Sequence, residues 1–393
     1  MDFSGSRVYF AANGIGFGHV SRDAPIATEV KQRGGEVMFS TFLDGVDYAR
    51  QHRFRVVSAP PLTMMNDESG GIDLRLSSIK QGIVAPVTFL SQVRFELRVM
   101  KRFRPDVIVS DSRLSSIYAA KLLGVPVISI LNQFTVLVPR KVNNFRLRFA
   151  DASIMTLLGW MWAWSDLILI PDFEEPYTLS IENLRIPEPY KRKVRFIGAI
   201  LTKKPEECMP RVNIRRNLGV SEDQYLVFAG ISGPKAERLP LLRILEPIFE
   251  GFPDSIQVVM SLGTPMGGSK STVSGSLIKV PWIEDRFSVL NASDAVVSRG
   301  GHETIMQSIS FRKPALVIPV PGHPEQYGNA RTCKRLGVAE AIHQRDITYE
   351  NLLQKINSLL YYKSYKSKLD EVAKHTHLGE GVDETMRAIA SVA

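Results

Sequence analysis

Short apolar runs that suit β-strands alternate along this chain with longer amphipathic stretches that suit helices. The runs in the first half are "RVYFAA", "EVMFST", "RVVSAP", "DVIVSD" and "PVISIL". Those in the second half are "DQYLVFAGIS", "IQVVMSLG", "SLIKVPWI", "DAVVSRGG" and "PALVIPV". Such alternation is typical of parallel strands joined by crossover helices, so we expect an α/β fold.

The alternation runs once, stops at a polar, proline-containing segment over 202–213, and then starts again. We therefore expect two doubly wound, Rossmann-like domains that face a cleft, the first over 1–203 and the second over 204–365. Helical patterns over 349–361 and 369–392 predict that the last segment, 366–393, packs back across both domains. Ligands of such sheets bind at the carboxyl ends of the strands.

Composition narrows the class of protein further. The two cysteines, Cys208 and Cys333, form neither a disulfide framework nor a zinc-binding spacing, which fits a reducing compartment. The longest apolar stretch, over 152–164, is shorter than the ~20 residues that span a bilayer. The N-terminus has no signal-peptide layout, so we expect a cytoplasmic protein. The net charge of +9 is dispersed and accompanies no nucleic-acid-binding motif, so no nucleic-acid partner is expected.

A glycine-rich loop, "NGIGFGHVSR", follows the first predicted strand and opens a helix. Its spacing is not that of a dinucleotide fingerprint, and no acidic residue closes the next strand. Glycines still let a ligand approach the backbone, and His19 at the helix start is a candidate general base. Asp111 ends a strand at the same sheet edge. It could orient His19, or it could cap the helix that follows.

A second candidate site lies within "SRGGHETIMQSISFRKPALVIPVPGHPEQYGNA". A predicted strand ends at Ser298, Gly300 and Gly301 allow a tight turn, and a helix then begins near His302. The free N–H groups of that helix would suit a diphosphate. A polar loop follows the next strand, at the same sheet edge.

These two segments resemble the sequences of GT-B glycosyltransferases. The likeness is to the group of lipid-linked N-acetylglucosaminyltransferases and diacylglycerol galactosyltransferases, and more narrowly to archaeal-type members. It implies an acceptor-binding N-terminal domain and a donor-binding C-terminal domain. It also implies inverting, metal-independent transfer from a nucleotide-sugar, expected to be a UDP-sugar, to a hydroxyl that could be lipid-linked. His19 would be the base and Asp111 its orienting partner, with no cofactor.

The resemblance also implies donor contacts, residue by residue. They are Gly16, Gly18, Ser232, Gly233, Trp282, Ile283, Arg299, Gly301, His302, Glu303, Thr304, Gln307, Glu325 and Gln326. Asn329 would support the last loop. Trp282 could stack on the nucleotide base or be a core aromatic residue. Gln307 stands where the family carries a glutamate for the ribose hydroxyls. An amide accepts with one oxygen only, so ribose binding should be weaker or differently arranged, which leaves the UDP donor open.

Two other functions stay open. UDP-N-acetylglucosamine 2-epimerases share the fold, but they need several acid/base carboxylates that the motifs do not assemble. A non-catalytic nucleotide-sugar-binding or membrane-recruiting subunit would fit Gln307, although His19 and Gln326 argue against it.

The segment over 138–164 joins basic residues to a Trp-rich stretch. It could lie on an anionic membrane, which would make the protein peripheral on the inner face, or it could be an ordinary core helix.

Overall fold

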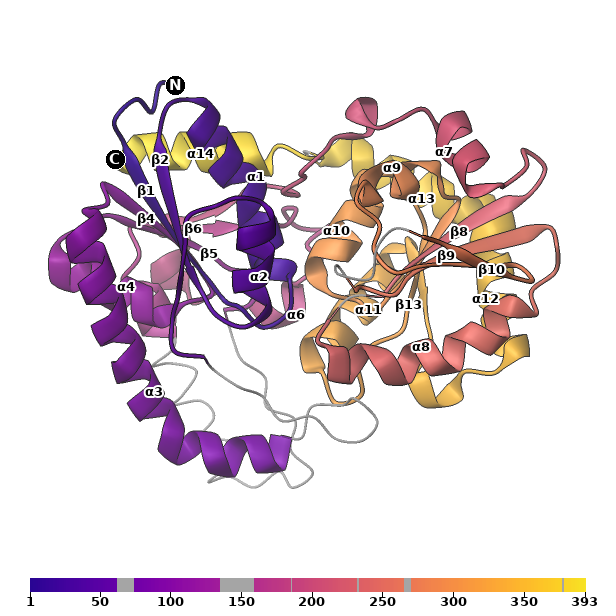
Figure 1. Ribbon diagram of the computed structural model, residues 1–393, viewed down its shortest axis with the longest axis horizontal. Coiled ribbons are helices and arrows are strands. Elements are labelled where there is room, and N and C mark those ends of the chain that lie inside the picture. The colour runs from indigo at the N-terminus through magenta and orange to yellow at the C-terminus, as the bar shows by residue number, and fades with distance from the viewer. Residues whose placement is uncertain (62–73, 135–158, 185, 232, 265–269, 377) are drawn as a thin grey trace. The chain divides into compact units, whose positions relative to one another are not determined.

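A computed structural model describes residues 1–61, 74–134, 159–184, 186–231, 233–264, 270–376 and 378–393 (Figure 1). These residues belong to two compact units. The first unit contains the chain up to Thr202 together with Gly379–Ala393, and the second begins at Lys203 and ends at Leu378.

The first unit is built on a parallel sheet with the strand order β3-β2-β1-β4-β5-β6-β7. Its strands are β1 (Arg7–Ala12), β2 (Glu36–Thr41), β3 (Val56–Ser58), β4 (Val107–Asp111), β5 (Val127–Ile130), β6 (Leu167–Ile170) and β7 (Val194–Phe196). Its helices include α1 (Gly18–Gln32), α2 (Asp44–Gln51), α3 (Leu74–Phe103), α4 (Leu114–Leu123), α6 (Ile181–Leu184), η1 (Glu188–Lys193) and α14 (Gly381–Val392).

The second unit has a sheet of order β10-β11-β9-β8-β12-β13-β14, which is parallel except for the β10–β11 pair. Its strands are β8 (Tyr225–Gly230), β9 (Ile256–Ser261), β10 (Thr272–Ser274), β11 (Leu277–Val280), β12 (Ala295–Ser298), β13 (Ala315–Val317) and β14 (Ala339–Ala341). Its helices include η2 (Pro205–Glu207), α7 (Arg211–Leu218), α8 (Lys235–Glu250), α9 (Arg286–Ala292), α10 (His302–Ser310), α11 (Pro324–Leu336), η4 (Gln344–Asp346), α12 (Tyr349–Tyr361) and α13 (Lys363–His375).

The predicted α/β class and the two Rossmann-like sheets are confirmed. Both faces of the first sheet are covered, because the residues of β1 from Val8 onward are buried on either face. Val8 and Phe10 belong to one hydrophobic cluster, while Tyr9 and Ala11 belong to another. In each sheet the strand order reverses once, between β1 and β4 and between β8 and β12. These two reversals are the expected places for ligands, at the carboxyl ends of the strands.

The structure departs from the sequence-based prediction near the C-terminus. The pattern over 369–392 is not one helix, because α13 ends at His375 and α14 starts at Gly381. Gly379 between them has a positive φ of 81°, which a continuing helix does not allow. The two helices belong to different units, and α14 packs beside α1 (Figure 1).

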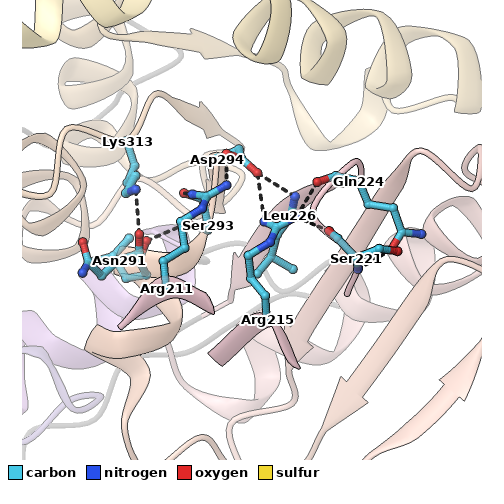
Figure 2. A network of polar contacts seen from close by, with 10 residues as sticks. Arg211, Arg215, Ser221, Gln224, Leu226, Asn291, Ser293, Asp294 and Lys313 are labelled. Carbon is cyan, nitrogen blue, oxygen red and sulfur yellow. Dashed lines mark hydrogen bonds and ion pairs between the residues drawn. The ribbon is translucent and has the colours of Figure 1, made fainter. Parts of the chain in front are cut away.

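A polar cluster joins α7 to the amino ends of the second sheet (Figure 2). Asp294, just before β12, accepts from the backbone N–H of Leu226 at 2.8 Å and from the guanidinium of Arg211 at 2.6 Å. Lys313 donates to the carbonyl of Asn291 at 2.7 Å. Burial and the nearby Arg211 cation lower the pKa of Lys313 to about 8. Because the strands are parallel, this cluster lies at the sheet edge opposite their carboxyl ends.

Candidate active site

The first predicted pair of residues meets at the strand-order reversal of the first sheet. Ala12 ends β1 and lies beside Asp111, which ends β4. His19 is the second residue of α1, and its Nδ1 is 2.7 Å from Asp111 Oδ1. The carboxylate is fully buried, whereas a quarter of the His19 side chain is exposed. The geometry therefore presents an imidazole to solvent on a buried acidic support.

Arg22, one helical turn after His19, also binds Asp111. Its Nε donates to Oδ2 at 2.8 Å, and one terminal nitrogen donates to Oδ1 at 2.5 Å. Burial alone would raise the pKa of Asp111, but the Arg22 cation and the imidazole of His19 hold that pKa well below its usual range. An ionised carboxylate only accepts hydrogen bonds, so Nδ1 of His19 carries the hydrogen and Nε2 is left as the basic nitrogen.

The alternative role of Asp111 as a helix cap does not agree with the structure. Helix α4 begins at Leu114, and the residue at its N-cap position is Arg113. The turn over 112–113 therefore separates Asp111 from the start of the helix.

The glycine-rich loop is held in place by its own contacts. Gly16 has a positive φ of 69°, and its N–H donates to Asp44 Oδ2 at 3.1 Å. A Cβ on Gly14 would lie 1.7 Å from the carbonyl oxygen of Phe42, so this glycine is required for packing. Gly18 is the first residue of α1. The loop is thus tightly positioned between β1 and the start of α2.

A buried polar cluster that the sequence analysis missed lies behind this loop. Glu96 of α3 accepts from Tyr9 at 2.6 Å, from Ser40 at 2.7 Å and from Arg113 at 2.6 Å. Arg113 also donates to the carbonyl of Ala12, directly before the loop, at 3.1 Å. Burial and the Glu96 carboxylate raise the pKa of Tyr9. A signal was available in the sequence, because Glu96 interrupts the apolar stripe of a long amphipathic helix.

The second predicted site lies at the corresponding reversal of the second sheet. Gly300, two residues after β12, has a positive φ of 83°, and a Cβ there would lie 2.6 Å from Val317. Asn329 of α11 donates to the Gly300 carbonyl at 3.1 Å, so it supports this turn. Gly301 is the N-cap of α10, and a Cβ on it would meet no atom within 4 Å. The space beside Gly301, where α10 begins, is therefore open.

Two of the proposed donor contacts form hydrogen bonds to other parts of the chain. Arg299 is almost fully buried and donates to Gln344 at 2.7 Å and to the Glu237 carbonyl at 3.0 Å. Burial lowers its pKa to about 10. We expected Arg299 to contact the donor, but these contacts make it a support behind the turn. Gln326 accepts from the Val320 N–H through its side-chain oxygen at 2.8 Å.

Gln307, at the position where the family carries a glutamate, is buried and faces Glu303. Its side-chain nitrogen donates to Glu303 Oε1 at 2.7 Å, and Arg286 of α9 is 3.4 Å from the same oxygen. The carboxylate of this helix thus lies one turn nearer its start than the family pattern implies.

The other predicted donor contacts differ in burial. His302 is buried, whereas Gly233, Trp282, Ile283, Thr304 and Glu325 are half-buried. Trp282 is therefore only partly buried, which differs from the fully buried side chain of a core aromatic residue. Ser232 and most of the basic and Trp-rich segment over 138–164 lie outside the described residues.

The described residues contain neither a metal-binding cluster nor a membrane-spanning helix. Among them, no three His, Cys, Asp or Glu side chains gather as a metal site would require. None of the helices described is both long enough and apolar enough to cross a membrane.

Both sites fall in segments that match known protein families. Residues 267–380 match the glycosyltransferase family 28 C-terminal domain, and residues 6–156 match glycosyl transferase family 1. An uncharacterized glycosyltransferase of Methanopyrus kandleri is 27% identical over 371 residues, which cover 93% of this chain and 98% of that protein. The UDP-N-acetylglucosamine–N-acetylmuramyl-(pentapeptide) pyrophosphoryl-undecaprenol N-acetylglucosamine transferase 1 of Bacillus cereus is 25% identical, covering 69% of this chain and 70% of that protein.

A solved structure shares the fold over almost the whole length. The spinosyn rhamnosyltransferase SpnG, complexed with thymidine diphosphate, aligns with a TM-score of 0.67 at 16% identity. The alignment covers 97% of this chain and all of that chain.

Proposed function

Because this chain is a glycosyltransferase of the GT-B fold, we propose that it moves a sugar from a nucleoside diphosphate donor, a UDP-sugar by expectation, to a hydroxyl acceptor with inversion. The observation that carries the proposal is the contact between His19 and the buried, ionised Asp111 at a strand-order reversal. An imidazole that is a quarter exposed and carries a fixed hydrogen on Nδ1 is equipped to take a proton at Nε2.

The reaction is a single displacement. The acceptor oxygen forms a bond to the anomeric carbon while the bond from that carbon to the diphosphate oxygen breaks, and the acceptor proton goes to Nε2 of His19. Asp111 stabilises the imidazolium that results, and the nucleoside diphosphate leaves with the bonding electrons. Negative charge therefore grows on the diphosphate and positive charge on His19.

We place the leaving diphosphate at the start of α10. The space beside Gly301, where this helix begins, is open, and the helix dipole favours an anion there. The deeply buried Arg299 and the Asn329 amide hold the turn from behind. This arrangement supplies positive potential without a resident metal ion. The relative complexed with thymidine diphosphate supports a nucleoside diphosphate as the ligand class.

Gly301→Ala tests this placement. The backbone at Gly301, with φ −60° and ψ 136°, is one that alanine adopts freely, and the added methyl would meet no protein atom. The methyl would instead occupy the space proposed for the diphosphate. The ligand is UDP, unless GDP or dTDP raises the melting temperature of the wild type more. We expect its affinity, measured by calorimetric titration, to fall by at least about tenfold in Gly301→Ala.

The matched control is Gly251→Ala in the same unit. Gly251 ends α8 with φ −88°, and a Cβ there makes only ordinary contacts at 3.7–3.8 Å. Both variants should melt like the wild type, and only Gly301→Ala should bind less nucleotide. Equal affinity in the two variants would move the diphosphate away from α10.

For the acceptor, we propose a lipid-linked hydroxyl received at an aromatic surface of the first unit. Phe89, Tyr118, Trp164 and Trp160 follow one another in ring contact, with centroids 4.6–6.1 Å apart. Lys121 and Lys193 line a pocket of about 470 Å³ beside Trp164. Trp160 is exposed and the other three rings are half-buried. Aromatic rings beside lysine side chains suit an anionic membrane interface. The Bacillus cereus relative, whose name includes pyrophosphoryl-undecaprenol, supports a lipid-linked acceptor.

A flotation experiment tests the membrane part of this proposal. Leu122 and Trp160 are 59% and 48% exposed, so changing both to serine removes apolar contact area without opening the core. We expect the wild type to float with vesicles that contain phosphatidylglycerol and the double variant to stay in the soluble fraction. The control is Val273→Ser, which changes an exposed apolar residue of the second unit. This variant should float like the wild type. A wild type that never floats would refute the membrane contact.

A further inference from the structure

We propose that Arg22 is a positioning residue that sets the pH range in which His19 acts as a base. This inference rests on the proposed function, because it concerns the same imidazole. Arg22 is 4% exposed, and its guanidinium grips both oxygens of Asp111. One terminal nitrogen also lies 3.2 Å from Nδ1 of His19. The site is therefore a triad with a permanent cation, rather than a simple pair of imidazole and carboxylate.

The net charge of the triad depends on the protonation state of His19. With His19 neutral, the charges of Arg22 and Asp111 cancel. When His19 takes a proton, the triad becomes cationic, and two positive groups lie side by side in a partly buried place. Without the arginine, the same protonation would neutralise a lone Asp111 carboxylate and would be favoured. Arg22 therefore keeps His19 unprotonated at lower pH and helps it release the proton after transfer.

The geometry of the Nδ1 contact agrees with this role. Nδ1 donates its hydrogen to Asp111, so the guanidinium N–H beside it has no lone pair to bond on that atom. The two groups are held together only because each binds the same carboxylate. Because Asp111 holds them close together, the positive charge of Arg22 disfavours the positively charged form of His19.

Other charged groups lie on the elements packed against α1, but among the described residues none of these groups forms a hydrogen bond or ion pair with the ring that the structure records. The recorded hydrogen bonds and ion pairs of the His19 ring go to Asp111 and Arg22. The remaining titratable or charged groups on α1, α2, β1, β2 and α14 are Asp23, Glu29, Lys31, Asp44, Asp47, Tyr48, Arg50, Arg7, Tyr9, Glu36, Asp383, Glu384 and Arg387. Asp44 and Tyr48 contact the loop before His19: Asp44 accepts from the Gly16 N–H, and the centroid of the Tyr48 ring lies 6.0 Å from that of Phe17.

The test is the pH dependence of nucleoside diphosphate release from the sugar donor that binds best, with water as acceptor. Arg22→Gln keeps a donor but removes the charge, and it should move the acidic limb of kcat/KM upward by about one pH unit. Arg22→Lys keeps the charge but loses the bidentate guanidinium contact with Asp111. The acidic limb of its kcat/KM profile should therefore stay in place while kcat falls. Arg33→Gln, which removes a surface arginine of the same helical region paired with Glu29, should change neither.

A second readout needs no turnover. The imidazole of His19 can be titrated by NMR, assigned by loss of its signal in His19→Gln, and its midpoint should rise by about one unit in Arg22→Gln. An unmoved midpoint, or an equal rise in Arg22→Lys, would overturn the role of the charge. If the wild type released no nucleotide from any donor, the proposed function would fail, and the NMR titration would still decide the role of Arg22.

Discussion

Replacing His19 by alanine is expected to lower kcat for sugar transfer by about 10²–10⁴-fold, because the attacking hydroxyl loses the group that takes its proton. The structure gives the physical reason. Asp111 is buried and ionised, so it fixes the imidazole hydrogen on Nδ1 and leaves Nε2 for the substrate. Donor affinity should change little, since the α10 start that we assign to the diphosphate belongs to the second unit.

The measurement is steady-state release of nucleoside diphosphate, together with titration of nucleotide binding. Asp111→Asn should also lower kcat strongly, because an amide no longer fixes the hydrogen on Nδ1 and cannot stabilise an imidazolium. His52→Ala is the matched control: His52 is the C-cap of α2, its Nδ1 donates to the Tyr48 carbonyl at 2.9 Å, and its ring stacks on the Tyr48 ring. Turnover in His19→Ala that equals the wild type would remove His19 from the mechanism, as expected if the acceptor were an already ionised phosphate.

The largest loss of stability is expected from Arg113→Met. Both Arg113 and Glu96 are buried, and the change would leave the Glu96 carboxylate without its cation in the interior. Removing one partner of a buried ion pair typically costs about 3–5 kcal/mol of unfolding free energy. The Ala12 carbonyl would also lose a donor directly before the glycine-rich loop.

Urea unfolding followed by tryptophan fluorescence measures this effect. Trp160, Trp162 and Trp164 all lie in the first unit, so the signal mainly reports on the unit that carries the change. Converting both Glu96 and Arg113 to methionine should cost less than Arg113→Met alone, because no unpaired charge is then buried.

Arg55→Met removes one partner of an exposed ion pair with Glu36 and should stay within about 0.5 kcal/mol of the wild type. A loss in Arg113→Met as small as that of Arg55→Met would show that the Glu96 cluster is not a stabilising support.

Most of the fold could be predicted from the sequence because parallel strands buried on both faces leave continuous apolar runs. "RVYFAA" and "EVMFST" coincide with β1 and β2 to the residue. The strands β6, β7, β10 and β14 were not predicted. Strand β7 has only three residues, so its pairing with β6 depends on the sheet it joins rather than on its own pattern.

The candidate site was predictable where the backbone topology places residues together. His19 follows the first predicted strand and Asp111 ends another at the same sheet edge, and the structure brings them into contact. Their catalytic roles stay predictions. Arg22 was missed although it lies one turn from His19, because an arginine at that spacing is usually a surface residue. Only the tertiary structure shows that it is buried on the same carboxylate.

Donor contacts were harder to predict, since family position does not specify which way a side chain turns. Arg299 follows a strand end, yet its guanidinium bonds Gln344 and the Glu237 carbonyl inside the unit. Gln307 binds Glu303 on the same helix. Both outcomes depend on the packing around the helix, which a motif does not encode.

The helix α14 has a consequence for how the protein is made. Met386, Ala388 and Ile389 belong to the same hydrophobic cluster as Phe10 and Val109, so the first unit lacks part of its interior until α14 is present. That helix follows the whole second unit in the sequence. On the ribosome, the second unit is therefore synthesised completely before the last buried side chains of the first unit are made. The first unit can complete its hydrophobic core only after the second unit has been synthesised.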